Sequence, residues 1–91
     1  MRKRVEVNYT GRVHGVGFRF TAERLAHFHN IVGYVMNKSD GGVKVVAEGE
    51  EKNLNDFLKA VKDEMENNID NSHADWFPAS GEFKTFEIRF Y

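Results

Sequence analysis

Hydrophobic residues change their spacing repeatedly along this chain, and the order of those changes restricts the fold more than any other feature. Val5, Val7 and Tyr9 alternate with polar residues, as in a half-buried β-strand. From Phe18 onward the apolar residues recur at helical spacing, and Asn30 fits the end of that helix because asparagine tolerates a left-handed backbone. The chain therefore begins with a strand followed by a helix.

The next two elements are predicted to form a β-hairpin. Residues 31–37 and 43–48 are rich in side chains that favour strands, and Ser39-Asp40-Gly41-Gly42 separates the two runs. Asp-Gly is a strong hairpin signal because the short turn needs residues that accept positive φ. We expect these two strands to be antiparallel neighbours.

The second half of the chain is expected to add a helix and two strands. Residues 54–65 have helical spacing, and Asn53 with Asp56 resembles a capping box at the helix start. We expect a short strand at 74–77 and a closing strand at 86–90. Two strand-helix-strand units joined by a hairpin give a ferredoxin-like fold. We therefore predict an α+β, ferredoxin-like two-layer sandwich: a βαββαβ core plus a fifth strand, with both helices on one face of the sheet.

Length and composition restrict the chain further. Ninety-one residues suffice for one core, so we expect a single domain over residues 1–91. Cysteine is absent, which excludes disulfides, thiolate chemistry and cysteine-bound zinc. Eight phenylalanines suggest that large rings supply much of the core. No apolar run has the length of a signal peptide core or of a membrane span of about 20 residues, so we expect a cytoplasmic protein that does not bind membranes.

Charge is distributed unevenly between the two halves of the sequence. Residues 1–40 contain seven Lys or Arg and three Asp or Glu, whereas residues 41–91 contain six and eleven. A site for an anionic ligand is therefore expected in the first half, although surface charge also varies this much without function.

The segment Gly11–Gly17 holds three glycines and joins the first strand to the first helix. Glycines let backbone amides approach a phosphate closely, and the positive end of the helix dipole lies at the same point. Arg19 adds a planar donor group that suits two phosphate oxygens. The alternative is a tight turn followed by a solvated arginine. The segment is neither a P-loop nor a dinucleotide fingerprint, because no Gly-Lys-Ser/Thr follows it and Phe20 replaces the third glycine of the fingerprint.

Asn37 is a second candidate, since asparagine is disfavoured in strands, although it is also an ordinary residue at a strand end. The histidines give little indication of metal binding. His27 and His29 point about 200° apart on a helix and cannot share a metal ion.

Two long motifs indicate which protein family the sequence resembles. They read Gly11-x-Val13-x-Gly15-Val16-x-Phe18-Arg19 and Gly33-Tyr34-Val35-x-Asn37-x-x-Asp40-Gly41-x-Val43, and Glu48-Gly49 follows them. This pattern resembles the acylphosphatase family over nearly the whole chain. The resemblance implies sheet order 4-1-3-2-5 and hydrolysis of acyl phosphates to a carboxylate and inorganic phosphate, without metal or cofactor.

The resemblance also implies roles for single residues. Arg19 matches a phosphate-binding arginine and Asn37 matches an asparagine that orients the attacking water. Substrate would be bound along the 13–19 loop by His14, Gly15, Val16, Gly17, Phe18 and Arg19. The implied partners are a small acyl phosphate and the product phosphate, with no nucleic acid, no membrane and a monomeric chain.

The sequence departs from the family pattern at three places. His14 replaces a more frequent glutamine, which should alter rate or pH dependence more than function. Asn30 replaces a glycine at the helix end, and both residues accept a left-handed backbone. Many members of the family have Gly-Pro after the second helix, and this chain does not. The resemblance therefore constrains the register of the fourth strand least.

Two other classes of function compete with the enzyme. An RNA-binding module shares the βαββαβ order, but its third strand would carry stacking aromatics, whereas residues 42–48 read Gly-Val-Lys-Val-Val-Ala-Glu. A non-catalytic anion-binding domain would keep the glycine-rich loop without needing Asn37. Domains that handle carbamoyl phosphate within larger enzymes are similar as well.

Overall fold

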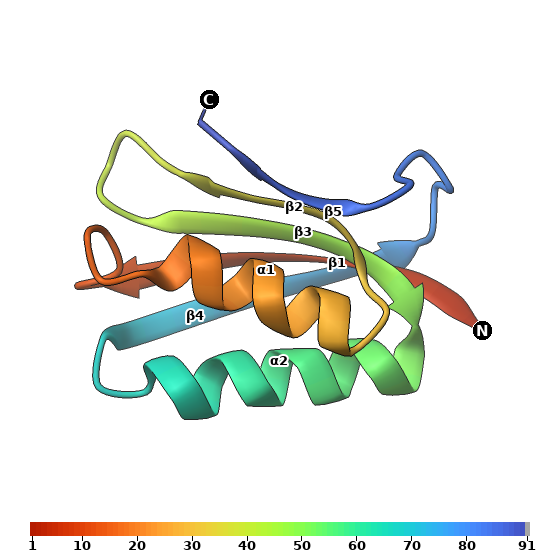
Figure 1. The fold of residues 1–91 in the computed structure, drawn as a ribbon, viewed down its shortest axis with the longest axis horizontal. Helices are drawn as coiled ribbons and strands as arrows, with labels where there is room; N and C mark the ends of the chain where they lie inside the picture. Colours follow the sequence, from red (N-terminus) through yellow and green to blue (C-terminus); the bar gives the residue numbers. More distant parts are fainter. Residues whose placement is uncertain (91) are drawn as a thin grey trace.

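The computed structural model describes residues 1–90, which form five strands and two helices (Figure 1). In chain order these are β1 (Arg2–Gly11), α1 (Phe18–Phe28), β2 (Val32–Asn37), β3 (Val43–Glu50), α2 (Glu51–Met65), β4 (Ile69–Pro78) and β5 (Phe86–Arg89). The element order agrees with the prediction from the sequence. None of the helices in residues 1–90 is long and apolar enough to cross a membrane.

The strands form one mixed sheet in the order β4-β1-β3-β2-β5, as the resemblance implied. β2 and β5 are parallel, while every other neighbouring pair is antiparallel. Both helices lie on one face of this sheet (Figure 1). Because β1 and β2 each run antiparallel to β3, they run parallel to each other and end at the same edge. This confirms the ferredoxin-like α+β sandwich.

Strand periodicity decides which side chains enter the core. Along β1, Val5, Val7 and Tyr9 face the helices and are buried, while the residues between them face the other side. Valine contributes most to the buried interior. Of the eight phenylalanines only Phe18, Phe57 and Phe86 are buried, so the expectation that rings supply much of the core is only partly met.

Two local predictions in the second half of the chain are wrong. α2 begins at Glu51 after Glu50, without a side-chain cap, so Asn53 and Asp56 lie inside the helix and form no capping box. The fourth strand was expected at 74–77, but β4 pairs along almost all of β1. Polar residues at 70–73 are tolerated there because β4 is an edge strand whose side chains remain largely exposed.

The outer face of the sheet is covered by the segment between β4 and β5. Glu48 of β3 is fully buried there and accepts hydrogen bonds from the Ser80 amide at 3.0 Å, the Ser80 hydroxyl at 2.7 Å and the Gly81 amide at 3.0 Å. Arg4 Nη1 donates to the same carboxylate at 3.1 Å. The buried carboxylate therefore fixes the chain that leads into β5.

Candidate active site

One end of the sheet gathers the segments that the sequence singles out. β1, β2 and β5 all run toward this edge, so the loop after β1, the hairpin after β2 and the end of β5 meet there. Figure 1 shows the loop and the hairpin on the left of the molecule, beside the first turn of α1. The topology thus brings together two motifs that are far apart in the sequence.

The loop between β1 and α1 needs its glycines for its backbone shape. Gly15 and Gly17 have φ values of 70° and 79°, a region that other residues rarely adopt. A Cβ built on either glycine would meet nothing within 4 Å. Conformation rather than crowding therefore requires glycine, and the loop surface remains open to a small ligand.

The start of α1 has the properties of an anion-binding helix terminus. Gly17 precedes the helix without a side-chain cap, and the first turn holds no acidic residue. The first backbone hydrogen bond of α1 runs from the Thr21 amide to the Gly17 carbonyl. The amides of residues 18–20 therefore have no partner within the helix. These amides and the helix dipole favour negative charge at this point.

Arg19 lies in this first turn and is partly buried. Its guanidinium carbon lies 5.1 Å from the centre of the Phe90 ring, just beyond β5. No carboxylate of residues 1–90 forms an ion pair with Arg19. Stacking restricts the arginine while its N–H groups keep their donor capacity.

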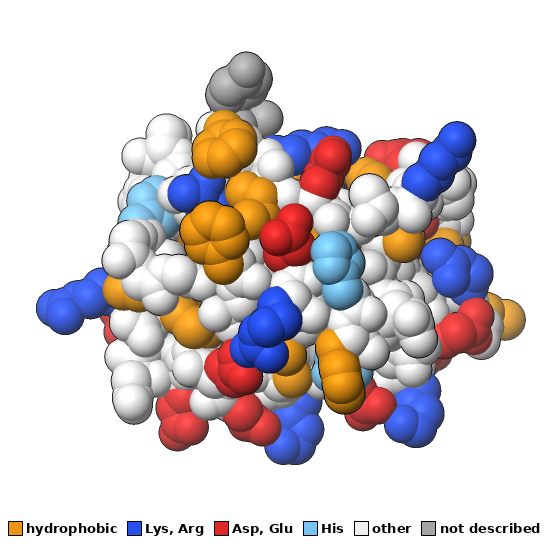
Figure 2. All heavy atoms as spheres, viewed as in Figure 1, with side chains coloured by type: hydrophobic (Ala, Val, Ile, Leu, Met, Phe, Trp, Pro, Cys, Tyr) orange, Lys and Arg blue, Asp and Glu red, His pale blue; other side chains and the backbone are white. Residues whose placement is uncertain are grey.

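Hydrophobic side chains surround this end of the molecule. Figure 2 shows them gathered near the start of α1 and the end of β5. Phe20 and Phe90 are 70% and 72% exposed, which is unusual for phenylalanine. The arginine therefore lies in a partly apolar setting.

Asn37 closes β2 on the face of the sheet that carries the helices. It pairs with Val43 in the register and follows the buried Val35 by two positions, so its side chain is on the inner face. Its amide oxygen is buried and has no hydrogen-bond partner. In residues 1–90 no other buried side-chain nitrogen or oxygen lacks a partner. Such an atom costs free energy unless something binds it, which indicates a ligand or water here.

The hairpin that follows Asn37 is attached directly to the loop. His14 Nε2 lies 2.7 Å from the Gly42 carbonyl oxygen, so the ring donates a hydrogen bond from loop to hairpin. A Cβ on Gly42 would come within 2.7 Å of the Tyr9 carbonyl oxygen, so the turn approaches β1 as closely as only glycine permits. The Gly42 amide donates to Asp40 Oδ1 at 2.9 Å, and this bond lowers the pKa of Asp40.

The predicted residues thus occupy one end of the fold, with two additions. Phe90 and Gly42 contribute through contacts that connect distant parts of the chain, and no local pattern marks either contact in the sequence. His14 was predicted to bind substrate through the backbone of the loop, and this stays a prediction. Its ring binds the hairpin. No group of three or more His, Cys, Asp or Glu within residues 1–90 could hold a metal ion.

Comparisons with known proteins agree with this geometry. The acylphosphatase family model matches residues 5–88. The chain belongs to the acylphosphatase family. An acylphosphatase from Caldanaerobacter subterraneus subsp. tengcongensis is 36% identical over 97% of this chain and 99% of its own length. One from Leuconostoc mesenteroides is 50% identical over 66% of this chain and 67% of its own.

Solved structures give the same answer for the fold. The crystal structure of acylphosphatase from Bacillus subtilis superposes with a TM-score of 0.88 at 29% identity, covering 97% of this chain and 99% of that one. The groups at this end of the sheet suit the binding of a phosphoryl group and a water. Amides and a guanidinium can neutralise phosphoryl oxygens, and an amide oxygen nearby can hold a water.

Proposed function

We propose that this chain hydrolyses acyl phosphates by holding the phosphoryl group on the amides of the 13–19 loop and Arg19 while Asn37 orients the attacking water. Family membership supports the reaction class. The buried, unpartnered amide oxygen of Asn37 carries the assignment of roles, because it lies at the same end of the sheet as the loop and needs a hydrogen-bond donor.

The chemical step needs little beyond positioning. The water oxygen attacks phosphorus while the bond between phosphorus and the acyl oxygen breaks, and the carboxylate leaves with both electrons of that bond. A carboxylate is a good leaving group at neutral pH, so no general acid is needed. A phosphoryl oxygen of the substrate accepts the proton of the water. The protein then supplies charge neutralisation and orientation, which dominate phosphoryl transfer.

Nucleic acid is a weaker candidate for a ligand. RNA-binding relatives of this fold use the sheet face opposite the helices to stack bases. In this chain Glu48 is buried on that face, and the Phe83 ring packs against Tyr34 with 6.0 Å between ring centres. We also infer a cytoplasmic monomer, since every proposed site group comes from one chain and the lack of cysteine fits a reducing compartment.

The deciding experiment replaces Asn37 by alanine. Turnover of benzoyl phosphate should fall about 100-fold or more, the scale seen when one preorganised polar group is removed. Inorganic phosphate should still raise the melting temperature as in the parent protein, because the loop and Arg19 are unchanged. Asn55→Ala, at an exposed position of α2, is the matched control and should leave both properties unchanged.

The outcomes distinguish the enzyme from an anion-binding domain. Near-normal turnover in Asn37→Ala would remove this residue from the reaction. If the parent protein bound phosphate but did not hydrolyse benzoyl phosphate, the non-catalytic domain would be favoured.

A further inference from the structure

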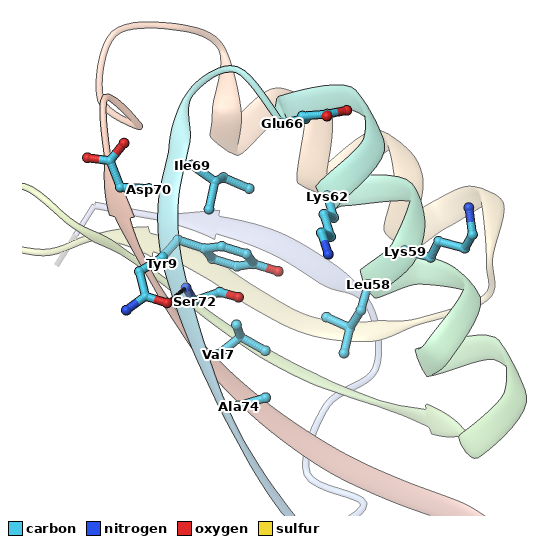
Figure 3. A pocket seen from close by; sticks show the side chains of 11 residues that line it. Val7, Tyr9, Leu58, Lys59, Lys62, Glu66, Ile69, Asp70, Ser72 and Ala74 are labelled. Atoms are coloured by element: carbon cyan, nitrogen blue, oxygen red, sulfur yellow. Dashed lines mark hydrogen bonds between the residues drawn. The ribbon is translucent and has the colours of Figure 1, made fainter.

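A cavity lies beside the edge strand β4, away from Asn37 and from the 13–19 loop. It has a volume of about 660 Å³ and opens between α2 and β4, above β1 (Figure 3). Neither Asn37 nor any residue of the 13–19 loop lines it. The volume lies within the range of pockets that bind small molecules, about 300 to 1,000 Å³.

The cavity exists because β4 places small side chains opposite large ones. In the sheet register Ser72 pairs with Tyr9 and Ala74 pairs with Val7 on the face that carries the helices. These short side chains leave space that α2 does not fill. The apolar part of the lining comes from both strands, α2 and the start of β4, and comprises Val7, Leu58, Ile69 and Ala74.

The side chains of Tyr9 and Lys62 direct polar groups toward the apolar part of the lining. The Tyr9 ring is almost fully buried, while its hydroxyl reaches the cavity and forms no hydrogen bond with residues 1–90. Burial raises the pKa of the Tyr9 phenol, so the hydroxyl keeps its proton and can donate it in a hydrogen bond. Lys62 points its side chain into the cavity, toward the Tyr9 ring (Figure 3).

The charges around the opening favour an anion. Lys62 has no ion pair within residues 1–90, whereas Lys59 is paired with Asp63 at 2.9 Å. The carboxylates of Glu66 and Asp70 line the rim but point away from the interior (Figure 3). The Lys62 ammonium and the hydroxyls of Tyr9 and Ser72 therefore face the cavity without a carboxylate between them.

We propose that this cavity binds a small amphipathic carboxylate, with its apolar body against Val7, Leu58 and Ala74 and its carboxylate between Lys62 and the Tyr9 hydroxyl. This site is separate from the phosphate site, and it goes beyond the hydrolysis of acyl phosphates. A charge-assisted hydrogen bond orients the ligand, while burial of its chain supplies the rest of the affinity.

Octanoate is a suitable probe, and chemical shifts of backbone amides in the full chain report where it binds. Saturable shifts should centre on residues 58–62 and 72–74. Lys62→Met should weaken binding about tenfold, the scale of one hydrogen bond to a charged group. Octan-1-ol, which lacks the charge, should bind the parent protein more weakly by a similar factor.

Three variants serve as controls for location. Ala74→Leu fills the cavity from an exposed edge position and should abolish the shifts while the spectrum remains that of a folded protein. Lys52→Met removes an exposed lysine from the first turn of α2 and should change nothing. Arg19→Ala should also leave octanoate binding unchanged.

The proposal is overturned if no saturable shifts occur, or if Ala74→Leu binds octanoate as the parent does. Shifts centred on the 13–19 loop and lost in Arg19→Ala would also overturn it, since the carboxylate would then be bound by the phosphate site.

Discussion

Arg19 and Asn37 are prepared for their proposed roles by different neighbours. Asn37 is held by the backbone of β2, and its amide oxygen is buried without a hydrogen-bond partner. Arg19 depends on a long side chain, and stacking on Phe90 limits the rotamers that it must give up on binding. The two motifs singled out both residues, whose roles stay predictions, whereas the ring that stacks on Arg19 lies 71 positions away in the sequence.

Replacement of Arg19 should separate phosphate binding from folding. Phosphate at ten times its dissociation constant should stabilise the parent protein by about 1.4 kcal/mol. For a domain of this size that corresponds to a rise in melting temperature of roughly 6 to 11 °C. Arg19→Ala should lose most of this rise, because the bidentate donor is gone.

Arg24→Ala is the control variant for these thermal melts. It removes an exposed arginine of the same helix that pairs with Glu64, and it should keep the full phosphate effect. An equal rise in the parent and in Arg19→Ala would place the anion elsewhere.

Elements were predictable where local signals decide them. The first strand, the first helix and the Asp40-Gly41 hairpin follow from periodicity and turn residues within a few positions. β4 was underestimated because its length depends on pairing with β1, which residues 70–73 do not reveal. The contact between the loop and the hairpin, through His14 and Gly42, likewise joins elements distant in sequence.

Loss of the hydrogen bond between His14 and the Gly42 carbonyl should impair catalysis more than stability. His14→Ala removes a hydrogen bond worth about 1 kcal/mol, so unfolding by urea should shift only slightly. The hairpin carries Asn37, and a small displacement of an oriented group can lower turnover up to about 100-fold. We therefore expect kcat/KM for benzoyl phosphate to fall about tenfold.

A conservative variant makes this test specific. His14→Gln keeps an N–H donor toward the Gly42 carbonyl and should restore most of the activity. If His14→Ala had parental kcat/KM, the bond would have no part in orienting Asn37.

The whole molecule is stabilised from both sides of its sheet. The helices cover one face over a core in which valine predominates, and the Glu48 cluster fastens the segment before β5 to the other face. The number of phenylalanines did not predict this core, because several rings lie exposed on α1, on β4 and beyond the end of β5. Exposure of a ring depends on tertiary packing, which composition does not specify.

The Glu48 cluster should make stability depend on pH. Burial raises the pKa of Glu48, but hydrogen bonds from Ser80, Gly81 and Arg4 outweigh burial and lower it below its usual value. Protons therefore bind more tightly to the unfolded chain. The stabilising contribution is complete above the pKa of the unfolded chain, about 4.3, and is lost as pH falls through the lower pKa of the folded protein.

Glu48→Gln removes the charge while keeping the shape of the side chain. At pH 7 it should reduce the free energy of unfolding by about 3 kcal/mol, the lower end of the scale for breaking a buried ion pair, because Arg4 keeps its pairs with Glu6 and Glu82. The parent loses its carboxylate contribution in acid and the variant has none to lose, so their free energies should converge below the folded pKa. Urea unfolding across a pH series measures both curves, with the exposed Glu87→Gln as control. A gap between parent and Glu48→Gln that stayed constant with pH would show that the charge of Glu48 is not what holds the segment in place.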